Sequence, residues 1–326
     1  MTAKPSPEST ASIDLLMAGP LLPGLMADIE SRYRVHRWWE IKDQAAFLET
    51  QGPAIRGIVT SGRFGADKAL IESLPALETI VSFGVGYDPI DIATAQARNV
   101  AVSNTPGVLD DCVADTALAL MLAASRRIVE ADRFVRAGRW PNEGFGLGRK
   151  IGGKRCGVVG LGNIGLQIAR RAEAFGMDIA YYNRRQRSDV PANYAYHADV
   201  LSLAQASDYL VLAVPGGAQT RHMIDAPVLE ALGPQGFLIN VARGTVVDET
   251  ALVKALQAKT IAGAGLDVFE FEPQVPAELM SLDQVVMLPH IASGTFETRK
   301  AMADLVVENL DAWFSRRELL TVSYTH

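Results

Sequence analysis

A glycine-rich segment at residues 157–165, GVVGLGNIG, is the first place where residue type and spacing could do chemistry. Gly160, Gly162 and Gly165 form the pattern G-x-G-x-x-G between an apolar run and a helical one. The first glycine suits a tight turn, the second lets the backbone approach a pyrophosphate, and the third lets the helix pack closely on the strand. The positive end of the helix also attracts phosphates. The pattern predicts a dinucleotide site with contacts from Leu161, Asn163 and Ile164 as well; a purely structural glycine turn is the alternative.

A basic turn follows the next apolar run, about twenty residues further on, and bears on the choice of dinucleotide. NAD-binding units carry an acid here, which accepts hydrogen bonds from the ribose hydroxyls and repels a 2′-phosphate. This chain has uncharged Asn183, and then Arg184 and Arg185, whose donors can clamp a phosphate dianion. Each such contact could contribute about 1–4 kcal/mol. We therefore expect NADPH as cofactor, with NADH weaker; the alternative is a solvated basic turn, which Arg187 extends.

Polar residues also stand at or just beyond the ends of three late apolar runs. Arg243 follows FLINVA, Glu272 lies in LDVFEFEP, and His290 ends VVMLPH. In open parallel sheets the carboxyl ends of the strands face the ligand crevice, so these side chains can converge there. Taken alone, each residue also has a structural explanation. His290 could be a histidine whose hydrogen bonds are made within the fold, Glu272 a solvated loop acid, and Arg243 a surface cation.

Short strand-like runs and helical stretches alternate along the chain, as is typical of α/β architecture, and these elements must position the polar residues. We expect strands in the first part at residues 13–19, 33–39, 55–60, 78–83 and 100–104, and in the second part at 156–160, 178–183, 194–197, 208–215, 237–242, 262–269 and 284–290. The near-continuous apolar character of the second series suits a parallel sheet covered on both faces.

Two longer helices are expected outside these series. One begins at Asp110 or Asp111, continues to about Val135 and is ended by Gly138, and a helix of this length suits packing against a second subunit. The other, at residues 295–314, places Met302, Leu305, Val306, Leu310 and Trp313 on one face.

Chain length, net charge and cysteine content limit the classes to which this protein can belong. A chain of 326 residues favours two domains. A net charge of −6 and a pI near 5.5 argue against a nucleic-acid binder. The two cysteines have no spacing that suggests a disulfide framework or a metal site. The early apolar stretch is interrupted by Pro20 and Pro23 and is too short to span a membrane, so we expect a cytoplasmic protein.

Several ordered motifs together resemble the D-isomer-specific 2-hydroxyacid dehydrogenase family, and within it the NADPH-dependent glyoxylate/hydroxypyruvate reductases. They are VSFGVGYDPID, VSNTPGVLDDCVAD, NVARGTVVDETAL, AGLDVFEFEP and LPHIASGT, and they cover nearly the whole chain. The resemblance implies two Rossmann-like doubly wound parallel-sheet domains with a cleft between them. It assigns residues 1–106 and 295–326 to a discontinuous substrate-binding domain and 107–294 to the NADP-binding domain. It also implies a homodimer.

The resemblance assigns roles position by position. Arg243 matches the arginine that holds the substrate carboxylate and polarises the ketone. His290 matches the general acid, and Glu272 matches the carboxylate that favours the imidazolium form. Asp267 matches a residue at the nicotinamide end, with a strand-terminal cap as the alternative.

Further contacts follow from the same resemblance. It implies cofactor contacts at Val214, Val241 and Ala242. The backbone N–H groups of Val85 and Gly86 match the loop that receives the substrate carboxylate, where small residues allow close approach. Ser61 and Gly62 could line the same pocket. Trp140 matches a tryptophan that reaches the partner's active site, or is a dimer-interface or surface aromatic. Trp38 and Trp39 either border the pocket or pack in the core or at a strand edge.

The expected reaction is NADPH-dependent reduction of glyoxylate or hydroxypyruvate to the D-2-hydroxyacid. A bulkier substrate, such as 2-ketogluconate or an aromatic 2-oxoacid, is the alternative within the class. A different alternative is a corepressor-like protein that shares the fold and binds dinucleotide to control assembly.

Overall fold

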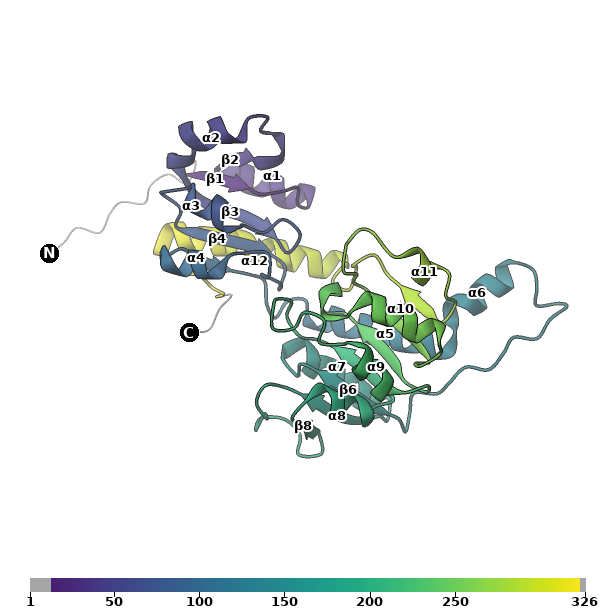
Figure 1. The fold of residues 1–326 in the computed structure, drawn as a ribbon. Coiled ribbons are helices and arrows are strands. Elements are labelled where there is room, and N and C mark those ends of the chain that lie inside the picture. The colour runs from purple at the N-terminus through teal and green to yellow at the C-terminus, as the bar shows by residue number, and fades with distance from the viewer. Residues whose placement is uncertain (1–12, 323–326) are drawn as a thin grey trace. The chain divides into compact units, whose positions relative to one another are not determined.

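The computed structural model describes residues 13–322, which form two compact units (Figure 1). The first unit contains the described residues up to Leu109 and those from Thr295 onward, and the second unit is Asp110–Gly294. The terminal stretches 1–12 and 323–326, which the sequence assigns to the first domain, lie outside the described residues.

The first unit, as far as it is described, is built on a five-stranded parallel sheet in the order β2-β1-β3-β4-β5. The strands are β1 (Asp14–Met17), β2 (Arg34–Arg37), β3 (Ile55–Ser61), β4 (Thr79–Phe83) and β5 (Ala101–Ser103). The helices are α1 (Pro23–Arg32), α2 (Gln44–Thr50), α3 (Lys68–Glu72), α4 (Ile92–Ala97) and α12 (Phe296–Arg316), with 3₁₀ turns η2 (Trp38–Glu40) and η3 (Gly52–Ala54). Aspartates cap three of the short helices, because Asp43, Asp67 and Asp91 each accept a hydrogen bond from an N–H group of the first turn.

The final helix α12 returns to this first unit, as Figure 1 shows in yellow. Its apolar stripe is covered: Met302, Val306 and Leu310 are at most 1% exposed. It packs on β4 and α1. The amphipathic pattern in the sequence therefore predicted this helix and its covered face correctly.

The second unit, within the described residues, is built on a seven-stranded parallel sheet in the order β12-β11-β10-β9-β6-β7-β8. The strands are β6 (Arg155–Val159), β7 (Asp178–Tyr182), β8 (Ala195–His197), β9 (Tyr209–Leu212), β10 (Phe237–Asn240), β11 (Gly263–Leu266) and β12 (Val285–Met287). The helices are α5 (Asp110–Arg126), α6 (Ile128–Arg136), α7 (Asn163–Ala174), α8 (Val200–Gln205), α9 (Ala226–Leu232), α10 (Glu249–Gln257) and α11 (Ala277–Met280), with the 3₁₀ turn η4 (Gly244–Val246). The strand order reverses between β6 and β9, which is where doubly wound sheets bind ligands. The predicted α/β fold class is confirmed.

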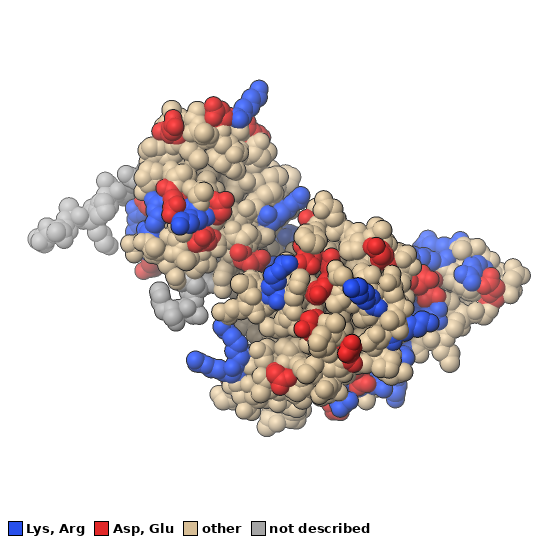
Figure 2. All heavy atoms as spheres, in the orientation of Figure 1, with Lys and Arg blue, Asp and Glu red and all other residues tan. Residues whose placement is uncertain are grey.

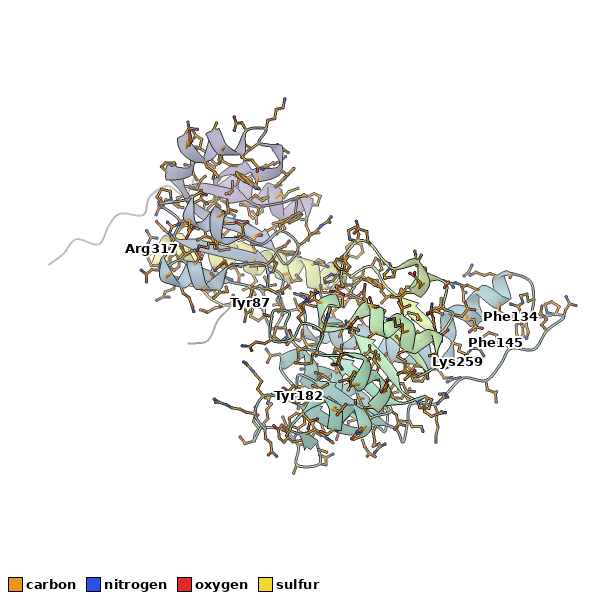
Figure 3. All side chains as sticks on the ribbon, in the orientation of Figure 1. Tyr87, Phe134, Phe145, Tyr182, Lys259 and Arg317 are labelled. Atoms are coloured by element: carbon orange, nitrogen blue, oxygen red, sulfur yellow. The ribbon has the colours of Figure 1, made fainter. Side chains whose placement is uncertain are left out.

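The prediction of one continuous helix from residue 110 to about 135 is wrong. The helix α5 ends at Arg126, Arg127 takes a left-handed conformation with φ of 55°, and α6 then begins. The break is stabilised by Arg127 itself, whose Nε donates to Glu130 Oε2 at 2.8 Å and whose guanidinium lies 4.6 Å from the centre of the Phe145 ring. Figures 1 and 3 show α6 and the following loop projecting from the second unit, with Phe134 and Phe145 together at 5.4 Å between ring centres.

The prediction of a strand through residues 33–39 is also wrong at its end. The strand β2 stops at Arg37, and Trp38 and Trp39 begin η2, closed by a hydrogen bond from Ile41 N–H to Trp38 O at 3.3 Å. Trp38 packs edge-on against Phe47, with ring centres 6.3 Å apart, and Trp39 is 37% exposed. Trp38 therefore packs against the core of the first unit, which was one of the alternatives considered from the sequence.

Charged side chains of both signs are interspersed on the face shown in Figure 2. No continuous basic stripe crosses the described part of either unit on this face. Among residues 13–322, no helix is long and apolar enough to cross a membrane.

Candidate active site

The glycine loop connects β6 to α7, and two of its glycines are required by close packing. Gly160 has φ of +94°, and a Cβ there would lie 2.7 Å from Val214 Cγ1. A Cβ on Gly165 would lie 2.0 Å from Gly160 O, so only glycine lets α7 approach the end of β6 this closely.

Gly162 differs from its neighbours because a Cβ there would meet no atom within 4 Å. It is the N-cap residue of α7, and no side chain caps the helix. The space beside Gly162 is thus open where α7 begins with Asn163 and Ile164, and no side chain caps its first-turn N–H groups, while Leu161 is fully buried. Unsatisfied N–H groups beside an open glycine are what a pyrophosphate requires, so the loop fits a dinucleotide.

Asn183, the residue expected to lie at the cofactor ribose, is held against the glycine loop. Asn183 follows β7, the strand next to β6, and its Oδ1 accepts a hydrogen bond from Leu161 N–H at 2.7 Å. The Asn183 carbonyl accepts from the Tyr196 hydroxyl at 3.3 Å. Asn183 therefore joins the end of β7 to the glycine loop.

The basic turn after Asn183 contains arginines of two kinds. Arg184 and Arg185 are exposed and make no hydrogen bond or ion pair with any residue between 13 and 322. Arg187 is only 26% exposed and forms an ion pair with Asp189. The turn thus presents two uncommitted cations close to the glycine loop.

The remaining predicted cofactor contacts follow the carboxyl ends of β9, which adjoins β6, and of β10, which adjoins β9. Val214 follows β9 and reaches Gly160, while Val241 and Ala242 follow β10 and are 8% and 6% exposed. All three lie at the carboxyl end of the parallel sheet, where the glycine loop also lies.

Arg243 continues the same segment after β10. Asn240 holds this turn, because its Nδ2 donates to Arg243 O at 3.0 Å and its Oδ1 accepts from Ala242 N–H at 3.0 Å. The next residue, Gly244, could not carry a side chain, since a Cβ would lie 1.8 Å from the carbonyl carbon of Phe269. This close approach places the segment of Arg243 against the segment that carries Glu272.

Glu272 and His290 form a hydrogen-bonded pair. His290 Nδ1 and Glu272 Oε2 are 2.7 Å apart, and Glu272 Oε1 accepts from Phe269 N–H at 3.0 Å. Burial would raise the pKa of Glu272, but the hydrogen bond and charge of His290, the Phe269 N–H and the charge of Arg243 together lower that pKa below its ordinary value. Glu272 is therefore an anion at neutral pH, bonded to one nitrogen of a ring whose Nε2 remains available for chemistry.

The backbone of His290 is held by Asp267. His290 has φ of 55°, a conformation that costs a non-glycine residue about 1–3 kcal/mol. Its N–H donates to Asp267 O at 2.8 Å, and the Asp267 carboxylate accepts from Ile291 N–H at 2.7 Å and Ala292 N–H at 2.9 Å. Burial raises the pKa of Asp267 against the opposing effect of these N–H groups. The carboxylate thus caps the segment after β12, and a contact of Asp267 with the nicotinamide end stays a prediction.

The predicted carboxylate-binding loop belongs to the first unit and lies after β4. Asn104 Nδ2 donates to Val85 O at 2.8 Å, and Thr105 Oγ1 accepts from Gly84 N–H at 3.1 Å, so the segment leading to Gly86 is held from the end of β5. Ser61 ends β3, and Gly62 follows it at the same sheet edge. Figure 3 labels Tyr87 directly after this loop.

Comparison with known proteins places this geometry in a family. The sequence matches the profile of the D-isomer specific 2-hydroxyacid dehydrogenase, NAD binding domain, over residues 118–292. A glyoxylate/hydroxypyruvate reductase A of Arabidopsis thaliana is 49% identical over 310 residues, covering 95% of this chain and 98% of that protein. The chain belongs to the D-isomer-specific 2-hydroxyacid dehydrogenase family.

Other members of the family are similarly close. A hydroxyphenylpyruvate reductase of Plectranthus scutellarioides is 48% identical, covering 95% of this chain and 98% of that protein. The crystal structure of an NADPH-dependent glyoxylate/hydroxypyruvate reductase of Sinorhizobium meliloti, in complex with NADP and malonate, has a TM-score of 0.89 and 45% identity, covering 95% of this chain and 96% of that one. The predicted family and the prediction of a dinucleotide-dependent oxidoreductase are confirmed.

Several residues that hold the candidate segments of each unit were not singled out from the sequence. Gly244 and Asn240 set the turn of Arg243, and Asn104 and Thr105 hold the Gly84–Val85 segment. In the sequence, Gly244 was the one available sign of this turn, because a glycine beside a functional residue often marks a place where two backbone segments approach closely. The contacts of Asn104 and Thr105 cross between strands and have no local signature.

Proposed function

We propose that this dehydrogenase reduces a small 2-oxoacid, glyoxylate or hydroxypyruvate, to the D-2-hydroxyacid with NADPH. The observation that carries the proposal is the His290–Glu272 pair, in which Nδ1 and Oε2 are 2.7 Å apart. The pair lies at the carboxyl end of the seven-stranded sheet, as do Arg243 and the glycine loop. A histidine beside a carboxylate supplies a proton, and a guanidinium holds a carboxylate and polarises a ketone.

Each polar residue has a separate task in the proposed reaction. Arg243 binds the substrate carboxylate and stabilises the negative charge that develops on the C2 oxygen. His290 donates the proton from Nε2 to that oxygen, and Glu272 holds the ring through Nδ1 and stabilises its charged form. When bound, the reduced nicotinamide supplies the hydride to C2. The backbone N–H groups of Val85 and Gly86 are further donors for the carboxylate.

The cofactor preference is proposed from the basic turn. Asn183 brings no negative charge to the ribose position, so a 2′-phosphate meets no repulsion there. Arg184 and Arg185 have no competing partner within residues 13–322, and therefore lose no ion pair when they bind a phosphate. The NADP complex of the Sinorhizobium meliloti relative supports the same preference.

Replacing Arg184 with alanine is expected to raise KM for NADPH about tenfold or more and to leave KM for NADH nearly unchanged. The reason is that the lost charge contact involves only the 2′-phosphate and is worth about 1–4 kcal/mol. Initial rates with each cofactor at saturating 2-oxoacid measure the effect. Arg170→Ala is the matched control, since Arg170 is an exposed arginine of α7 with no ion pair to another described residue. A wild-type preference for NADH would refute the assignment.

Replacing Glu272 with glutamine is expected to lower kcat/KM about tenfold. Glutamine keeps the size of the side chain but replaces the carboxylate that binds Nδ1 of His290 with a neutral amide. The full pH profile of kcat/KM measures this change.

The stability of the same variant provides an independent control. Because the pKa of Glu272 is lowered in the folded state, its ion pair stabilises the fold above the ordinary pKa of a carboxyl group, and this stability is lost as the pH falls through the lowered value. Thermal unfolding of the wild type should therefore depend more on acid pH than unfolding of Glu272→Gln. An unchanged activity profile would contradict the role of Glu272 even if this stability difference is observed.

A substrate panel tests the proposed reaction itself. NADPH consumption is measured with glyoxylate, hydroxypyruvate, 2-ketogluconate and hydroxyphenylpyruvate, and we expect the highest kcat/KM for one of the first two. The similarity to a hydroxyphenylpyruvate reductase makes the bulkier 2-oxoacids the second candidates. Consumption with none of the four would favour a dinucleotide-sensing, corepressor-like role.

The domain roles and assembly complete the proposal. The second unit would bind NADPH, the first unit would bind substrate, and the protein would be a cytoplasmic homodimer. Exposed apolar side chains on the projecting segment support the dimer: Val135 is 52%, Trp140 68% and Leu147 96% exposed. Whether Trp140 reaches a partner's active site stays a prediction.

A further inference from the structure

Arg187 lies in the same basic turn as Arg184 and Arg185, but its guanidinium is engaged by other residues of the protein. Its Nη1 donates to Leu161 O at 2.6 Å, and Leu161 is part of the glycine loop. Its Nε donates to Asp189 Oδ1 at 2.8 Å, and its Nη2 donates to the other Asp189 oxygen, which makes the ion pair bidentate. The run of basic residues in the sequence gives no sign of this difference.

The contact with Leu161 means that both backbone polar groups of this glycine-loop residue are held. Leu161 N–H donates to Asn183 Oδ1 at 2.7 Å, and Leu161 O accepts from Arg187 Nη1. Leu161 lies between Gly160, which has φ of +94°, and Gly162, whose Cβ position is open. Glycines restrict the backbone least, so a loop of this kind keeps one conformation only where other groups hold it. Two side chains from the segment after β7 hold this one.

The turn itself is anchored at both ends. At its start, Asn183 is bonded to Leu161. At its end, Arg187 N–H donates to the hydroxyl of Tyr181 at 3.1 Å, and Tyr181 is 1% exposed. Arg184 and Arg185 lie between these anchors and face solvent. The anchors therefore define where the two exposed cations stand relative to the glycine loop.

Arg187 is poorly placed to bind a phosphate of its own. Asp189 neutralises its charge, and the hydrogen bond to Arg187 lowers the pKa of Asp189, so the ion pair persists at neutral pH. Turning the guanidinium toward a phosphate would break the bidentate pair and leave Leu161 O without its donor.

We propose that Arg187, held by Asp189, is a positioning residue whose guanidinium fixes the glycine loop without touching the 2′-phosphate. The inference rests on the proposed function, in that a dinucleotide occupies the glycine loop. Because the pyrophosphate is common to both cofactors, Arg187 supports NADH and NADPH binding alike. Arg184 and Arg185 distinguish between the two.

The test compares Arg187→Met with Arg184→Ala in the full-length protein. The Kd of NADPH and of NADH is measured by fluorescence titration, together with kcat at saturating cofactor. We expect Arg187→Met to raise both Kd values by a similar factor of about ten or more, with kcat nearly unchanged, because methionine removes the donor to Leu161 O. Arg184→Ala is expected to raise only the Kd of NADPH.

The conservative variant Arg187→Lys separates positioning from general loss of structure. Lysine keeps one donor for Leu161 O but cannot pair with both Asp189 oxygens, so it should recover part of the binding of both cofactors relative to methionine. If Arg187→Met unfolds, the lysine variant and Asp189→Ala give the same comparison of the two Kd values.

Two results would overturn the inference. Loss of NADPH binding alone would make Arg187 a third phosphate-binding arginine, and unchanged binding of both cofactors would show that the loop does not depend on it. Failure of the proposed function looks different: a wild type that prefers NADH and an Arg184→Ala variant without effect would remove the NADPH assignment, while an equal loss of both cofactors in Arg187→Met would still support the positioning role.

Discussion

Replacing His290 with alanine is expected to lower kcat by about 10²–10⁴-fold, the usual contribution of a positioned general acid. The structure supports this size of effect because Glu272 binds Nδ1 of the ring at 2.7 Å, and Asp267 O accepts the backbone N–H of His290 at 2.8 Å. Both ring and backbone are thus oriented before substrate binds. Steady-state kinetics with NADPH and glyoxylate measure kcat, and titration with NADPH alone should show a nearly unchanged Kd.

The matched control is His36→Ala. His36 also pairs with a carboxylate, since its Nε2 lies 2.7 Å from Asp14 Oδ1, but it belongs to β2 of the first unit. Arg34 remains as a partner for Asp14 at 3.2 Å, so the carboxylate is not left unpaired. We expect kcat of this variant to stay within about twofold of the wild type. If His290→Ala retained near-normal kcat, another group would have to be the proton donor.

Replacing Arg243 with alanine is expected to lower kcat/KM for the 2-oxoacid about 10²–10³-fold, because the change removes the cation that holds the carboxylate and stabilises charge on the C2 oxygen. Asn240 holds the backbone of this residue, and the approach of Gly244 to Phe269 does not involve the Arg243 side chain. The loop should therefore keep its path in the variant. The Kd of NADPH measured without substrate is expected to change little.

Two further measurements make the role of Arg243 specific. Arg243→Lys keeps the charge but loses the planar fork, so it should recover only part of the lost rate. Added guanidinium ion should restore some activity to Arg243→Ala by occupying the vacated space. A variant whose defect lay entirely in NADPH affinity would show that Arg243 does not act on the substrate.

The sequence by itself determined the architecture and the glycine loop. Each predicted strand is present within a few residues, because buried parallel strands require continuous apolar runs and these are visible in any window of the chain. Gly160 and Gly165 could be interpreted without coordinates, since a tight turn with φ of +94° favours glycine and a helix–strand contact this close admits only glycine. Such requirements are local, and the residues that meet them are neighbours in the chain.

Only the tertiary structure decided which partner each polar side chain has. Arg127 at the helix break lies against Phe145, the Asp267 carboxylate accepts from Ile291 and Ala292, and Arg187 donates to the glycine loop. In each case the partner comes from a segment that folding brings near, and a long polar side chain can satisfy its hydrogen bonds in several ways. The packing of distant segments selects one of them, so that arginines of one turn differ in their partners.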